Sequence, residues 1–124
     1  MKITIRFASY QVEAELNNTP TAKAIYDSLP LHENVSLWGD EIYFEVPVEA
    51  RLEPDARPAV SVGDLAYWPN MPAFCIFFGP TPVSTGKTPV AASAVNVFGK
   101  LTLVEPEKLR KVPEGSKVTV TKSE

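Results

Sequence analysis

The chain has 124 residues, of which 44% are hydrophobic and 22% charged, and its formal net charge is −3. A length in this range is typical of one globular domain, so we expect residues 1–124 to form a single domain. The acidic balance argues against nucleic-acid binding, which needs gathered Lys and Arg side chains, and no apolar run approaches the ~20 residues of a membrane span.

The start of the chain alternates between polar and apolar residues. Residues 2–7 and 10–16 both alternate, and the short gap between them predicts an antiparallel hairpin with its apolar side chains facing the core. Because the first run is not a continuous apolar segment, it does not resemble a secretory signal. We therefore expect a cytoplasmic location.

One α-helix is predicted after this hairpin. Thr19 can cap its N-terminus, Pro20 suits the first helical position, and Pro30 ends the segment. Apolar residues recur at helical spacing in between, for example at Ile25 and Leu29. We expect the helix to lie across one end of a β-barrel.

The strand predicted for residues 41–48 has two unlike faces. Its apolar face carries Ile42, Phe44, Val46 and Val48. The opposite face carries Glu41, Tyr43 and Glu45, so two carboxylates flank a phenol. This polar face is either a solvated outer surface or the wall of a cleft.

The densest apolar and aromatic stretch spans residues 67–82. Within it, residues 74–78 form an unbroken apolar run bounded by Pro72 and Gly79, which predicts a central strand buried on both faces. Cys75 lies inside this run, and we interpret it as a small buried hydrophobic residue and not a reactive thiol.

Turn residues punctuate the rest of the chain. Its 12 prolines and 6 glycines separate short β-rich runs, a pattern that favours an all-β barrel or sandwich. Residues 60–68 lead back to the core through a turn at Gly63-Asp64. Further strand character occurs at residues 90–104 and 117–121, a short helical segment at 106–110, and exposed loops at 51–58 and 81–89.

No motif for a metal or a cofactor is found, and we predict neither. The chain has one histidine and one cysteine, and His32 has no Cys, Asp or Glu beside it at a ligand spacing. Two of the carboxylates Asp40, Glu41 and Glu45 could act together as an acid and a base, provided that burial raises one pKa.

Aromatic residues next to proline indicate a binding cleft. Tyr67 and Trp68 precede Pro69, and flat amphipathic rings at such a place suit the gripping of a ligand. Asn96 lies inside an apolar run, so its amide either satisfies nearby backbone groups or points at a ligand. The predicted ligand-binding residues, placed around one concavity, are Glu41, Tyr43, Glu45, Tyr67, Trp68, Phe78 and Asn96.

Four segments together resemble an uncharacterised prokaryotic family of cyclophilin-like domains. They are residues 38–44, residues 63–69, residues 75–82 and the Val-Asn-Val-Phe-Gly run at 95–99. The resemblance covers nearly the whole chain. It implies a closed antiparallel barrel of about eight strands with helix at the barrel ends.

True cyclophilins are similar at two places, residues 74–79 and the Val-Phe-Gly-Lys run at 97–100. Their active-site residues do not carry over. Their catalytic arginine falls in the Tyr-Trp-Pro run at 67–69, their active-site glutamine at Phe77, and their histidine near Val95. Since none of these can donate as a guanidinium does, the resemblance implies the fold without the isomerase chemistry.

Two functions remain open from the sequence. The first is a binding module that holds a small molecule or a peptide in an aromatic, partly acidic groove. The second is an enzyme, either a residual peptidyl-prolyl isomerase or a hydrolase-type catalyst that uses Glu41 or Glu45. The sequence does not predict the oligomeric state.

Overall fold

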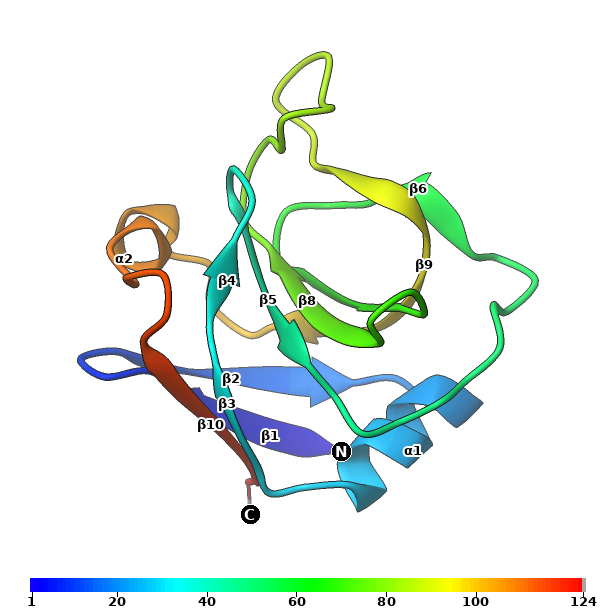
Figure 1. Ribbon diagram of the computed structural model, residues 1–124. Coiled ribbons are helices and arrows are strands. Elements are labelled where there is room, and N and C mark those ends of the chain that lie inside the picture. Colours follow the sequence, from blue (N-terminus) through cyan, green and yellow to red (C-terminus); the bar gives the residue numbers. More distant parts are fainter. Residues whose placement is uncertain (124) are drawn as a thin grey trace.

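The computed structural model describes residues 1–123, which form an antiparallel sheet with two short helices (Figure 1). The strands are β1 (Lys2–Arg6), β2 (Gln11–Leu16), β3 (Leu31–Asn34), β4 (Ser36–Leu37), β5 (Glu41–Glu45), β6 (Arg57–Ala59), β7 (Asp64–Trp68), β8 (Ala73–Phe77), β9 (Val90–Leu101) and β10 (Lys117–Lys122). The helices are α1 (Pro20–Asp27) and α2 (Pro106–Arg110).

The sheet is rolled up, but its end strands do not pair with each other. Its order is β3-β10-β1-β2-β9-β7-β8-β5-β4, and β6 pairs with β9 beside this path. The end strands β3 and β4 are consecutive in the chain and are separated only by Val35. The prediction of a closed barrel of about eight strands is therefore wrong in two respects. The described sheet has ten strands, and continuous backbone, not a hydrogen-bonded ladder, joins its two ends.

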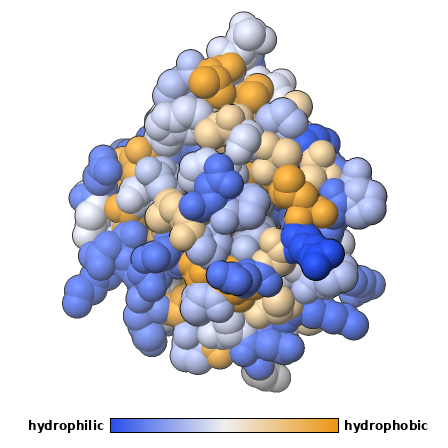
Figure 2. All heavy atoms as spheres, turned by 45° about the vertical axis from the view of Figure 1, so that its right-hand side comes forward, coloured by the Kyte–Doolittle hydropathy of each residue, from blue (hydrophilic) through white to orange (hydrophobic). Residues whose placement is uncertain are grey.

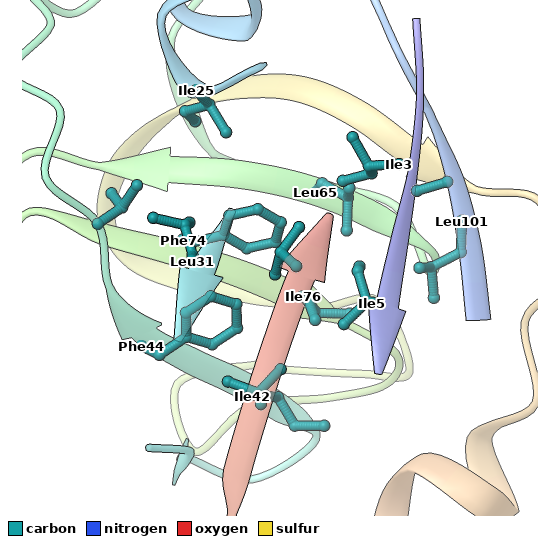
Figure 3. Close-up of a cluster of buried hydrophobic side chains, with 14 of the residues drawn as sticks. Ile3, Ile5, Ile25, Leu31, Ile42, Phe44, Leu65, Phe74, Ile76 and Leu101 are labelled. Carbon is teal, nitrogen blue, oxygen red and sulfur yellow. The ribbon is translucent and has the colours of Figure 1, made fainter. Parts of the chain in front are cut away.

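The main hydrophobic core lies inside the rolled sheet. Figure 3 shows isoleucines of β1, β5 and β8 pointing toward one another around two phenylalanine rings. Phe44 and Phe74 stack with their ring centroids 4.7 Å apart, and Phe98 meets Phe74 edge to face at 5.0 Å. Such aromatic pairs stabilise a core beyond the area that they bury.

A second apolar cluster lies on the outer side of β7 and β8. All five residues of β8 are buried, because its side chains alternate between the two clusters. Phe74 and Ile76 belong to the main core, whereas Ala73, Cys75 and Phe77 belong to the outer cluster. The predicted central strand with two buried faces is confirmed.

The predicted helix is confirmed, with an earlier end. The Thr19 side chain accepts a hydrogen bond from the Ala22 amide at 3.2 Å, and Pro20 is the first helical residue. The helix ends at Asp27, because the Ser28 amide already bonds back to the carbonyl of Ile25. Ile25 is fully buried against the main core, which it enters from α1 in Figure 3.

The structure differs from the prediction for one loop and for one strand. The loop predicted for residues 51–58 contains the start of β6, whose three residues are all exposed and so lack apolar periodicity. The strand predicted for residues 41–48 ends at Glu45, although Val46 and Val48 still face the core. Residues 106–110 form α2 as predicted.

The surface carries no broad apolar area on the face drawn in Figure 2, where hydrophobic side chains occur in separate groups divided by hydrophilic ones. Within residues 1–123, no helix has both the length and the apolar character that crossing a bilayer requires.

Candidate functional site

A pocket of about 250 Å³ opens on the outer side of the sheet. Its floor comes from β5, β7 and β8, and its wall comes from the first half of β9, which bends over them beside β6 (Figure 1). The residues that line it are Trp38, Glu41, Tyr43, Trp68, Cys75, Ala91, Ala92 and Val95.

A tight turn before β5 places two of these residues. The Trp38 amide donates to the Glu41 carbonyl at 3.0 Å, and the Glu41 amide returns the bond at 3.2 Å. Gly39 has a φ of +60°, and a Cβ there would lie 2.9 Å from the loop that follows β8, so only glycine fits. Arg110 of α2 holds the turn through an ion pair with Asp40 at 3.1 Å.

Glu41 is the charged group of the pocket. Its side chain is buried, with 6% of the residue exposed, and no salt bridge of the described residues involves it. Burial raises the pKa of its carboxyl to about 7, against a smaller opposing effect of the Cys75 thiol. Near neutral pH the carboxyl is therefore present in both protonation states.

Cys75 lies beside this carboxyl. Burial raises the pKa of its thiol well above the ordinary value, and the charge of Glu41 raises it further. The thiol is thus protonated at neutral pH, in agreement with the interpretation of Cys75 as a buried hydrophobic residue. It also lines the pocket, which the sequence did not indicate.

Aromatic side chains form much of the remaining lining. Trp38, Tyr43 and Trp68 are all partly exposed, unlike the aromatic residues of the main core. The indole Nε1 of Trp68 donates to the Ser93 hydroxyl of β9 at 2.7 Å. This bond fixes the ring between β7 and β9.

Tyr67 does not reach the pocket. It is 1% exposed and belongs to the main core, on the opposite side of β7 from Trp68. Its hydroxyl donates to the Val48 carbonyl at 2.8 Å and accepts from the Ala50 amide at 3.0 Å. The predicted place of Tyr67 in the concavity is wrong.

The Asn96 side chain does not line the pocket either. Its amide oxygen accepts from the Glu53 amide at 2.8 Å, and its amide nitrogen donates to the Arg51 carbonyl at 2.8 Å and the Thr21 hydroxyl at 3.0 Å. Of the two alternatives for this residue, the structural amide is found. All of its partners are in α1 and in the segment before β6.

Two further predicted site residues lie apart from the pocket lining. Phe78 is 2% exposed in the main core, so its place in the concavity is also wrong. Glu45 is exposed on the same strand face as Glu41 and Tyr43, but it does not line the pocket. The structure thus brings together Glu41, Tyr43 and Trp68, and adds Trp38 and Cys75 to them.

No metal centre is apparent in the part of the chain that the structure describes, since no three His, Cys, Asp or Glu side chains there are grouped so as to hold an ion. The carboxyl of Glu41, the phenol of Tyr43, the thiol of Cys75 and two indoles are the polar and aromatic groups of the pocket lining.

The rolled antiparallel sheet has the architecture of the cyclophilin-like class, and the family model described as cyclophilin-like matches residues 1–121. The chain belongs to this family. It is similar to a hypothetical protein from Archaeoglobus fulgidus with a known solution structure, at 40% identity and a TM-score of 0.83. The match covers 99% of this chain and 95% of that one. No protein with a curated description matches.

Proposed function

We propose that the chain is a binding module for a small molecule or a peptide side chain, held in the pocket around Glu41 and Trp68. The observation that carries this proposal is a buried carboxyl without an ion-pair partner among the described residues, in a pocket lined by three partly exposed aromatic rings. Ligand sites are typically concave and apolar, with few polar groups that fix orientation.

The position of the pocket also supports the proposal. Trp68 and Val95, which the resemblance aligns with the arginine segment and the histidine of true cyclophilins, both line it. Phe77, aligned with their glutamine, is fully buried in the outer cluster and does not line the pocket. The same surface would then bind a ligand without the groups that isomerise a prolyl bond.

A thermal-shift screen with metabolites, followed by calorimetry on the hits, tests the proposal. A ligand raises the melting temperature in step with its concentration over Kd. Trp68→Ala should reduce the shift at a given ligand concentration, whereas Leu103→Ala, which removes an exposed apolar side chain outside the pocket, should leave it unchanged. A set of hits that shift both variants equally would place binding elsewhere and contradict the proposal.

The second candidate is an enzyme that uses Glu41 for acid and base work. A pKa of about 7 is what such a group needs at neutral pH. A protease-coupled isomerisation assay and a panel of ester and amide substrates separate the candidates. Turnover that is lost in Glu41→Gln would favour the enzyme, and binding without turnover favours the module.

A further inference from the structure

Among the described residues, the only formally charged side chain in the pocket lining is an acidic one, Glu41. The lining contains no Lys, Arg or His side chain, so nothing in it neutralises the carboxylate form of Glu41. The titratable groups beside that carboxyl are Tyr43 of β5 and Cys75 of β8, while β7 and β9 contribute only Trp68 and apolar side chains. An ionised Glu41 therefore has no counter-ion among the described residues that line the pocket, and a ligand with a positive charge could provide one.

The aromatic rings have the same electrostatic preference. The Trp68 indole has a single donor, and Ser93 already accepts it at 2.7 Å. What Trp68 can offer a ligand is its ring surface, and the faces of indoles and phenols attract cations. Trp38 and Tyr43 provide two more rings beside the same carboxyl.

The apolar wall selects among cations. Ala91, Ala92 and Val95 provide no hydrogen-bond acceptors in their side chains, and an unsubstituted ammonium has three donors and a strongly bound hydration shell. Such an ion would find acceptors on Glu41 and Tyr43, but its donors that face this wall would lose water without replacement. An ammonium group whose hydrogens are replaced by alkyl groups has no N–H donor to leave unpaired, and its alkyl groups gain contact with the wall.

We propose that the pocket binds an alkylated ammonium group, with Glu41 as its counter-ion and Trp38, Tyr43 and Trp68 as the rings around it. This inference rests on the proposed binding function and names its ligand class. The group can belong to a free small molecule or to the methylated lysine of a peptide, and the test below separates these sources.

The test compares choline with 3,3-dimethylbutan-1-ol, in which carbon replaces the charged nitrogen, by titration calorimetry. Choline should bind at least tenfold more tightly at pH 8. Its affinity should rise about tenfold from pH 6 to pH 8, because only the ionised form of a carboxyl with a pKa of about 7 pairs with it. The alcohol should show no such rise.

Two variants identify the carboxyl. Glu41→Gln should remove most of the preference for choline over the alcohol, because only the rings then favour the cation, and it should remove the pH dependence. Glu45→Gln, the exposed neighbour on the same strand face, should change neither. Circular dichroism of both variants checks that they remain folded.

A peptide with trimethyllysine, measured beside its unmodified lysine form, separates the two sources. Binding of the modified peptide well above choline indicates a side chain as the natural ligand, and equal binding indicates a free cation. Equal affinities for choline and the alcohol, or no choline binding at pH 8, would overturn the cation inference. In either case a pocket ligand from the metabolite screen would leave the binding function standing, and only a failed screen would remove both.

Discussion

Tyr67 and Asn96 are register partners across β7 and β9, and both hold the segment between β5 and β6. Tyr67 bonds to the backbone of Val48 and Ala50, while Asn96 bonds to that of Arg51 and Glu53. Two buried polar side chains thus replace the ladder partners that this irregular segment lacks. Their role is structural.

Asn96→Ala should therefore destabilise the protein by about 2 to 4 kcal/mol, because buried backbone groups of the segment lose their partners. Urea unfolding followed by circular dichroism measures the change. Asn70→Ala, at an exposed asparagine, is the matched control and should cost well under 1 kcal/mol. An equally small loss for both variants would contradict the structural role.

Tyr67→Phe should cost about 1 to 3 kcal/mol by the same measurement, since the ring stays and only its hydroxyl is lost. The variant should keep the affinity of the pocket for choline. A large loss of choline affinity in a stable Tyr67→Phe protein would mean that this hydroxyl acts on the pocket after all.

Glu41 should make stability fall as pH rises. Its carboxyl ionises near pH 4.5 in the unfolded chain and near 7 in the folded protein, so the folded state binds the extra proton between these values. Between pH 5 and pH 8 this should cost about 2 kcal/mol. Urea unfolding at the two pH values should show the loss in the wild type and in Glu45→Gln but not in Glu41→Gln, and parallel curves for all three would refute it.

The sequence predicted one face of the site because strand alternation is local. In β5, residues 41 and 43 point to the same side, as expected. The same rule argues against the joint prediction for Tyr67 and Trp68, because neighbours in a strand point to opposite faces. Which of the two faces outward depends on how β7 lies between the clusters, and that requires tertiary structure.

The residues of the pocket wall could not be predicted from the local sequence pattern. Ala91, Ala92 and Val95 look like ordinary strand residues, and only the bend of β9 over β7 and β8 brings them to Trp68. The lack of pairing between the end strands β3 and β4 could not be predicted for a similar reason. Residues 31–37 form one β-rich segment, and its division at Val35 follows from two different pairing partners, β10 and β5.

Cys75 should react slowly with thiol reagents in the folded protein. It is 1% exposed and its pKa is raised, so little thiolate is present at pH 8. The rate of reaction with 5,5′-dithiobis(2-nitrobenzoic acid) should rise steeply in urea. In the folded state Glu41→Gln should react faster than the wild type, because the neighbouring negative charge is removed, whereas Glu45→Gln should not. A wild-type rate equal to that in urea would show that the thiol is open.

Trp68 should matter for binding far more than for folding. Trp68→Ala removes a partly exposed ring from the pocket and should weaken choline binding by about 1 to 3 kcal/mol through lost apolar and cation contacts, while the sheet stays folded. Ser93→Ala separates the ring from its hydrogen bond, since it leaves the indole in place without its acceptor at 2.7 Å. Calorimetry should give a smaller loss for Ser93→Ala, because the bond only orients the ring. Equal losses would mean that orientation by Ser93, and not the contact area of the indole, determines the affinity.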